Sequence, residues 1–288
     1  MEQMEEMNLV LKIQSVYNQF TRAEKKVADY CLQHREEVPF LSITDLADAC
    51  NVGDTSVYRF CRTLGLDGYQ EFKMKLSLCQ GTASMESRVL RVHDSEADPM
   101  DVMAQKVLEA HISAIRETGM LLNKAALEKT LTLMEQAGRI YFFGIGDSLL
   151  AAEEARNKFL RITSKVCCIS DPHMQAVAAS LATQTDLFFI ISYSGSTKDN
   201  IQVARLARKA GAKVVCISHF QKSPLTVCCD AVLLCGAKQG PLDGGSMSAK
   251  MGQLFLIDLL YQGYYERNMD ECSLNNEKAS AAVVEKLL

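Results

Sequence analysis

Apolar and polar stretches alternate regularly in the second half of the chain. From Arg139 onward, five short apolar runs are each followed by a helical stretch or a short irregular segment. The runs lie at 139–144, 165–169, 186–192, 213–218 and 230–235. Strand–helix alternation of this kind specifies a parallel sheet with right-handed crossovers and helices on both faces. We therefore expect an α/β domain with a five-stranded parallel sheet flanked by helices.

The third apolar run stops at a cluster of hydroxyl side chains around one glycine. Ser192, Ser194 and Thr197 supply hydroxyl donors, and Gly195 lets the backbone turn with a positive φ. Thr197 opens the next helix, whose first N–H groups have no partner within the helix. Because ligands bind beyond the carboxyl ends of parallel strands, we predict a phosphate-binding loop at 192–197. A turn with capping hydroxyls alone would give the same pattern.

The first apolar run also ends in a glycine-containing turn. Gly144, Gly146 and Ser148 lie there, and the glycines would let a ligand approach the backbone closely. A dinucleotide site of the GxGxxG type needs a third glycine, but residue 149 is leucine. Asp171, near where a ribose-binding acid would lie, precedes a proline and is more simply a helix cap. A small phosphorylated metabolite therefore fits better than a dinucleotide.

A glycine-rich stretch, 240–245, precedes a helix that we expect to start near Ser246. Ser246, Ser248 and Lys250 could close over a bound ligand from there. The same residues could equally do no more than cap and solvate that helix.

The N-terminal segment shows helical periodicity. Thr21 and Glu24 form a predicted capping box at the start of one helix, and the chain breaks at Pro39. Ser42 caps the next helix, and after a turn at 51–53 another helix runs to Gly65. Two short helices joined by a turn containing glycine are the outline of a helix-turn-helix, although any small helical bundle could contain such a pair.

The second helix of this pair would enter the DNA major groove. Its predicted core face consists of Val57, Phe60, Cys61 and Leu64. The outward-pointing side chains are candidate DNA contacts: Thr55, Ser56, Tyr58, Arg59 and Arg62. Lys73 of the following segment is a further candidate. The region is only marginally positive, so one copy should bind DNA weakly and a dimer would be needed.

Length and composition favour two domains. The chain has 288 residues, of which 48% are hydrophobic. Residues 81–100 lack sustained periodicity, so we expect a linker there, between a domain at 1–80 and a domain at 101–288. A net charge of −4 restricts any nucleic-acid contact to a local surface.

The cysteines, the apolar stretches and the N-terminus indicate the cellular compartment of the protein. Several of the 11 cysteines lie inside apolar runs and none shows C-x-x-C spacing, so we expect reduced, buried thiols and no metal site. No apolar stretch is long enough to cross a membrane, and the acidic N-terminus is unlike a signal peptide. These features predict a cytoplasmic protein.

Taken in order, these motifs resemble the RpiR family of bacterial transcriptional regulators. The resemblance rests on SITDLA at 42–47, VYRFCRTLGLDGYQEFK at 57–73, GIGDS at 144–148 and SYSGST at 192–197. It implies an all-α N-terminal helix-turn-helix domain joined to an α/β sugar isomerase (SIS) domain. In such proteins the SIS domain binds a phosphosugar as effector without converting it.

The resemblance also implies residue roles. It places Arg59 and Arg62 on the recognition helix, and it assigns ligand binding to Gly144, Gly146, Ser148, Ser192, Ser194, Gly195 and Thr197. Two positions depart from the family pattern. Asp147 stands where a neutral residue would better suit a phosphate, and Lys250 stands where similar proteins commonly have arginine.

The leading hypothesis is therefore a DNA-binding repressor of sugar or amino-sugar metabolism genes. We expect a homodimer or tetramer that binds a duplex operator and is controlled by a phosphosugar, without a cofactor or catalytic residue. A phosphosugar isomerase is the rival, with His219, His173, Glu153 and Glu154 as candidate bases. A phosphosugar-sensing protein regulator that does not bind DNA is a third possibility.

Overall fold

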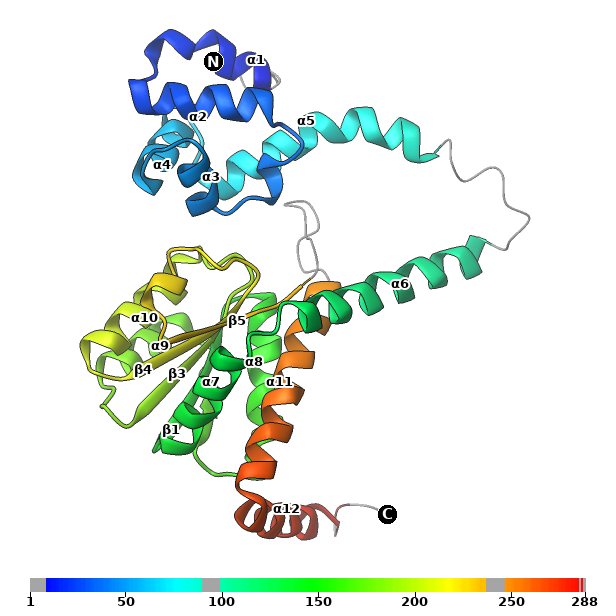
Figure 1. The fold of residues 1–288 in the computed structure, drawn as a ribbon, viewed down its shortest axis with the longest axis vertical. Coiled ribbons are helices and arrows are strands. Elements are labelled where there is room, and N and C mark those ends of the chain that lie inside the picture. The colour runs from blue at the N-terminus through cyan, green and yellow to red at the C-terminus, as the bar shows by residue number, and fades with distance from the viewer. Residues whose placement is uncertain (1–8, 90–98, 237–246, 285, 287–288) are drawn as a thin grey trace. The chain divides into compact units, whose positions relative to one another are not determined.

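The computed structural model describes residues 9–89, 99–236, 247–284 and 286, which form two compact units (Figure 1). The described residues up to Val107 belong to the first unit, and those from Leu108 onward belong to the second. Helix α6 (Pro99–Met120) contains the division between the two.

Every regular element described in the first unit is helical, as predicted. The helices are α1 (Leu9–Ser15), η2 (Tyr17–Gln19), α2 (Arg22–Gln33), η3 (Val38–Phe40), α3 (Ile43–Ala49), α4 (Asp54–Thr63) and α5 (Tyr69–Val89). Phe60 of α4 lies at the centre of their core, with its ring centroid 5.1 Å from that of Phe20 and 5.4 Å from that of Phe72. The recognition-helix candidate is therefore held rigidly by the rest of the unit.

A buried glutamate joins the start of α2 to the end of α4. The predicted capping box is present, since the Glu24 carboxylate accepts hydrogen bonds from the Thr21 N–H and hydroxyl, both at 2.7 Å. It also accepts one from the Thr63 hydroxyl at 2.9 Å. Burial raises the pKa of Glu24, but these hydrogen bonds outweigh it and the pKa is lowered. The carboxylate stays ionised and fixes α4 against α2.

The second unit contains the five-stranded parallel sheet that the sequence predicts. Its strands are β1 (Arg139–Gly144), β2 (Val166–Cys168), β3 (Asp186–Ile191), β4 (Lys213–Ser218) and β5 (Ala231–Leu234). They lie in the order β2-β1-β3-β4-β5, and every neighbouring pair is parallel. All six residues of β3, the central strand, are buried.

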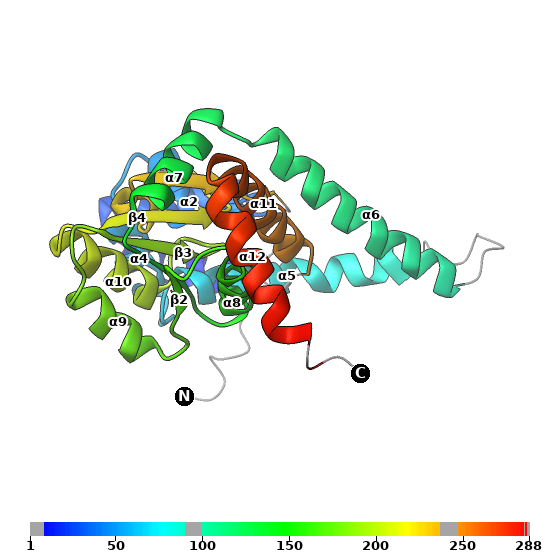
Figure 2. The same ribbon diagram turned by 90° about the horizontal axis from the view of Figure 1, so that it is seen from below.

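Helices cover both faces of this sheet (Figures 1 and 2). On one face lie α7 (Lys124–Gln136), α8 (Asp147–Leu160) and α11 (Met247–Arg267). On the other face lie α9 (Pro172–Ser180), α10 (Lys198–Lys209) and the short η4 (Thr226–Cys228). The last helix, α12 (Met269–Val284), follows α11. Phe189 belongs to the first of these cores and Phe188 to the second, because successive side chains of a strand point to opposite faces.

The segment expected to be a linker is partly helical. Helix α5 continues to Val89 and α6 starts at Pro99, so within the expected linker only residues 90–98 are not described by the structure. A lone glycine such as Gly81 costs about 1 kcal/mol within a helix and does not end it. Lack of periodicity was therefore a poor sign of a helix boundary here.

All 11 cysteines are free thiols, as expected. Burial raises the pKa of Cys61 and of Cys235 to about 12, so these thiols stay protonated and unreactive at neutral pH. Among the described helices, none combines the length and hydropathy needed to cross a membrane.

Candidate functional site

The two predicted ligand-binding turns lie side by side in the second unit. β1 and β3 are neighbours in the sheet, and Gly144 at the end of β1 pairs with Ile191 at the end of β3. From β1 the chain passes to β2 at one side, whereas from β3 it continues to β4 and β5 at the other. At such a reversal of strand order, α/β sheets bind ligands beyond the carboxyl ends of the strands, and this place is called the crevice here.

The turn between β1 and α8 requires its glycines. A Cβ atom at Gly144 would lie 2.5 Å from the carbonyl oxygen of Ser148, which is closer than any real contact. Gly146 has φ 60° and ψ −128°, a conformation that L residues rarely adopt. A Cβ at Gly146 would meet nothing within 4 Å, so this glycine leaves open space beside the turn.

The loop from 192 to 197 is fixed at its base by the neighbouring strand and by a following loop. Gly195 has φ 58°, and a Cβ there would lie 2.1 Å from Ser223 Oγ. The Gly195 carbonyl accepts a hydrogen bond from the Leu225 N–H at 3.0 Å. Ser218 at the end of β4 donates its hydroxyl hydrogen to the Tyr193 carbonyl at 3.2 Å. The loop is therefore pre-formed.

The helices that start at these two turns have no side-chain cap. Gly146 precedes α8 and Thr197 precedes α10, and neither residue caps its helix through its side chain. In the same unit, Asn123 caps α7 and Asp171 caps α9. The free N–H groups of α8 and α10 are therefore available to an anion at the crevice.

The hydroxyl side chains of these two turns differ in exposure, since Ser192 is only 2% exposed whereas Ser148, Ser194 and Thr197 are half-buried. Those of Ser148, Ser192 and Thr197 form no hydrogen bond with any residue the structure describes. Ser194 Oγ accepts a hydrogen bond from the Ser196 N–H at 3.2 Å, which leaves its own hydrogen free to be donated. Two uncapped helix N-termini and four hydroxyl donors suit a phosphate group.

The helix that follows the glycine-rich stretch brings a cation to this place. Lys250, in the first turn of α11, forms an ion pair with Asp147 of α8 at 2.6 Å. Ser248 lies half-buried two residues earlier, in the same turn. Ser246 and the stretch 240–245 lie outside the described residues, so their predicted role remains a prediction.

An aromatic pair borders the crevice on the β4 side. The rings of Tyr193 and His219 stack with centroids 4.9 Å apart, and His219 Nδ1 lies 3.0 Å from the Cys235 carbonyl oxygen. Tyr193 was not among the predicted site residues, although its place between two loop serines could have indicated a site residue. Of the other candidate bases, His173 is exposed on α9, and Glu153 and Glu154 lie on α8.

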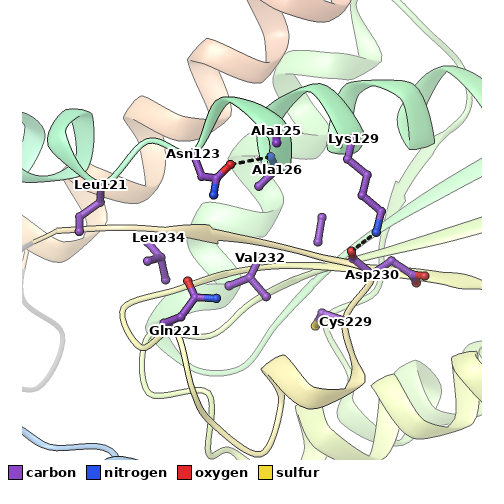
Figure 3. A pocket seen from close by; sticks show the side chains of 11 residues that line it. Leu121, Asn123, Ala125, Ala126, Lys129, Gln221, Cys229, Asp230, Val232 and Leu234 are labelled. Atoms are coloured by element: carbon purple, nitrogen blue, oxygen red, sulfur yellow. Dashed lines mark hydrogen bonds between the residues drawn. The ribbon is translucent and has the colours of Figure 1, made fainter.

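A separate pocket of about 360 Å³ lies between α7 and β5 (Figure 3). Asn123, Lys129 and Gln221 line it together with apolar residues. None of the predicted ligand-binding residues lines it. Its two charged side chains are already engaged, because Lys129 donates to the Asp230 carbonyl and the Asp230 carboxylate accepts from the Val214 N–H.

The helix-turn-helix in the first unit consists of α3 and α4. Ser42 caps α3, as predicted, by accepting a hydrogen bond from the Asp45 N–H at 2.9 Å. The turn contains Asn51 with φ 51°, and Lys26 of α2 donates to the Asn51 carbonyl at 3.4 Å. Gly53 precedes α4 and provides no side-chain cap. The N-terminus of α4 is therefore free to approach a phosphate.

The two faces of α4 are as the sequence predicts. Val57, Phe60, Cys61 and Leu64 are fully buried. The other face carries exposed or half-exposed residues: Thr55, Ser56, Tyr58, Arg59 and Arg62. Arg59 forms no ion pair or hydrogen bond with the residues the structure describes. Arg62 is engaged, since it pairs with Asp67 at 2.9 Å and donates to the Leu66 carbonyl at 3.2 Å.

Lys73 does not lie on this exposed face. Its side chain is only 6% exposed, and its ammonium group donates to the Leu41 carbonyl at 3.3 Å. Burial lowers the pKa of Lys73 to about 8. The sequence suggested a DNA contact from charge alone, whereas the spacing with Tyr69, Phe72 and Leu76 turns Lys73 toward the core.

Replacing Lys73 by methionine is expected to stabilise the first unit at pH 7, by an amount of order 1–3 kcal/mol, because a buried charge is removed. Between pH 8 and about 10, wild-type Lys73 loses its proton in the folded state, so the difference between variant and wild type should shrink. Urea unfolding of the full chain at pH 7 and at pH 9.5 would measure it. A wild type that is more stable than the variant at pH 7 would contradict this account.

Comparison with known proteins gives consistent results for both units. Residues 7–81 match the helix-turn-helix domain of the rpiR family, and residues 133–262 match the SIS domain. An HTH-type transcriptional regulator of Haemophilus influenzae is 33% identical over 97% of each chain. The HTH-type transcriptional regulator HexR of Pseudomonas aeruginosa is 35% identical over 89% of this chain and 88% of its own.

A solved structure resembles nearly the whole chain. The NanR protein of Vibrio vulnificus, complexed with ManNAc-6P, superimposes with a TM-score of 0.86. It is 27% identical, and the match covers 98% of this chain and 100% of that one.

Proposed function

This chain belongs to the RpiR family of helix-turn-helix transcriptional regulators, and we propose that it represses genes of sugar or amino-sugar metabolism under the control of a phosphosugar. The phosphosugar binds at the carboxyl ends of β1 and β3. Duplex DNA binds at the exposed face of α4. The regulator acts in the cytoplasm.

The observation that carries the effector site is the pair of uncapped helix N-termini at the switch in strand order. α8 and α10 start there beside the hydroxyls of Ser148, Ser192, Ser194 and Thr197. A backbone N–H group can only donate a hydrogen bond, and a hydroxyl can rotate so that it donates one. Both therefore suit the oxygen atoms of a phosphate. ManNAc-6P, named with the similar Vibrio protein, is a phosphosugar of the class proposed.

The DNA site follows from the exposed side chains of α4. Arg59 is the cation there that forms no ion pair or hydrogen bond with a described residue, and Thr55, Ser56 and Tyr58 supply polar contacts on the same side. Phosphate contacts by so few cations give weak binding per copy. We therefore propose that a homodimer or tetramer binds two half-sites, and that the phosphosugar shifts it between geometries that do and do not match them.

A thermal-shift screen of the full chain against a panel of phosphosugars tests the effector site. A ligand at 100 times its dissociation constant stabilises a protein by about 2.7 kcal/mol, which is readily seen. We expect a shift with at least one phosphosugar and none with the unphosphorylated sugar. Replacement of Thr197 by valine should remove the shift. A panel without any response would contradict the proposal.

Turnover would instead favour an isomerase. His219 lies at the end of β4 beside the crevice, so a coupled aldose–ketose assay with His219→Ala as control is the matching test. We expect the wild type to convert no phosphosugar. Conversion by the wild type that disappears in His219→Ala would favour the isomerase.

A further inference from the structure

The ion pair between Lys250 and Asp147 lies at the proposed phosphate site. Lys250 Nζ is 2.6 Å from Asp147 Oδ1, and the lysine side chain is only 13% exposed. Asp147 is 42% exposed and is the first residue of α8, directly after Gly146. The carboxylate thus stands at one of the two uncapped helix N-termini that we assign to the phosphate.

The electrostatics of helix α11 do not favour a lysine at position 250. A cation in the first turn of a helix is unfavourable beside the positive end of the helix dipole, and Lys250 is in the first turn of α11. A largely buried ammonium group also needs an anion nearby. Asp147 supplies that anion in the described part of the chain, and its own place at the start of α8 is favourable.

A phosphate at this crevice would change that balance. It would take the favourable position at the N-terminus of α8, repel the Asp147 carboxylate and attract Lys250. The ammonium group has three N–H donors, but the Asp147 carboxylate and a phosphate repel each other, so the two compete for the place beside it.

The turn of α11 that carries Lys250 packs directly against α6. Ala249 of α11 and Ala114 of α6 are buried against each other, and Tyr193 of the phosphate-binding loop packs on both. One turn later, a Cβ at Gly252 would lie only 2.6 Å from Thr118 Oγ1 of α6. Contacts between small residues leave no room for adjustment, so a shift of this turn must move α6 as well. α6 is the helix that contains the division between the two units.

We propose that Asp147 takes the place of the phosphate as the partner of Lys250 when no ligand is bound, and that exchange of this partner is the step by which a phosphosugar acts on α6. The inference rests on the proposed function and deepens it. In the ligand-free protein the carboxylate holds Lys250 toward α8. A bound phosphate draws Lys250 into the crevice, and the first turn of α11 moves with it.

The test compares Asp147→Asn with wild type by isothermal titration of the full chain. The probes are inorganic phosphate and the phosphosugar that gives the largest thermal shift, with ManNAc-6P included. We expect the variant to bind both probes about tenfold more tightly, because Lys250 is released and a repelling charge is lost. Asp258→Asn is the matched control. Asp258 pairs with Lys158 at 3.0 Å and joins the same two helices away from the crevice, so it should leave both affinities unchanged.

A second pair of variants separates the exchange from simple repulsion. Lys250→Gln should weaken phosphate binding, and adding Asp147→Asn to it should restore only the smaller part of the gain, which comes from lost repulsion. If instead the double variant regains the tenfold gain, Asp147 acts by repulsion only and the exchange is refuted.

The remaining outcomes are equally decisive. Unchanged affinities in Asp147→Asn would overturn the inference. So would a loss of phosphosugar affinity with unchanged affinity for inorganic phosphate, because Asp147 would then be a ligand of the sugar. If the wild type binds no phosphosugar at all, the proposed function itself fails and the inference falls with it.

Discussion

Alanine at position 195 is expected to abolish phosphosugar binding and to destabilise the second unit by about 2–5 kcal/mol. Gly195 has a φ of 58°, where an L residue is strained, and a Cβ would lie 2.1 Å from Ser223 Oγ and 2.6 Å from Ser223 Cβ. The loop must therefore move, and Ser194 and Thr197 on either side of it would leave the positions that we assign to phosphate contacts. Thermal unfolding and titration with a phosphosugar measure the two effects.

Gly211→Ala is the matched control for that result. Gly211 also has a positive φ, of 88°, but it follows α10 at the end away from the crevice, and the nearest atom to its Cβ would be Gln184 Cγ at 3.0 Å. This variant should lose stability and keep its affinity for the phosphosugar. If Gly195→Ala binds as tightly as wild type, or if Gly211→Ala loses binding to the same extent, the loop at 192–197 does not hold the phosphate.

Glutamine in place of Arg59 is expected to weaken operator binding roughly thirtyfold or more. One arginine contact to DNA contributes about 1–3 kcal/mol, and a dimer loses it in both half-sites. If Arg59 contacts a phosphate, its loss would also make the salt dependence of binding less steep, by about 0.9 in the logarithmic slope for each copy. Fluorescence anisotropy at several salt concentrations measures both, with a duplex selected by the wild-type chain from random sequences.

Two further variants serve as comparisons for Arg59→Gln. Arg62→Gln should have a smaller effect, because Arg62 already pairs with Asp67 and would have to exchange that partner for DNA. Arg208→Gln removes the same charge from the exposed surface of α10 and should have no effect. Equal losses in Arg59→Gln and Arg208→Gln would mean that net charge, and not the face of α4, determines DNA affinity.

Short-range patterns in the sequence were sufficient to predict most of the fold. The five apolar runs became the five strands, and the predicted caps at Thr21 and Ser42 are present. Both kinds of signal depend on residues within a few positions of each other. The glycines at 144, 146 and 195 were recognised for the same reason, since a tight turn after a buried strand needs them.

Features that depend on distant parts of the chain could not be predicted. Lys73 was grouped with the outward cations by charge, and its hydrogen bond to the Leu41 carbonyl, 32 positions earlier, is a contact that only the fold reveals. The ion pair of Asp147 with Lys250 joins residues 103 positions apart, and only the fold brings them together. The contact of Tyr193 with Ala114 and Ala249 likewise joins three separate elements. Such contacts are consequences of tertiary structure and leave no periodic trace in the sequence.

The central claim is that phosphosugar binding in the second unit controls DNA binding by the first. It is tested most directly by measuring the affinity of the full-length chain for its selected duplex, at fixed salt, with and without a saturating phosphosugar from the thermal-shift screen. Coupling between sites typically amounts to a factor of about 5–150, and we predict a fall in operator affinity in this range, with no change when the unphosphorylated sugar is added. An operator affinity that is the same with and without the bound phosphosugar would contradict the account.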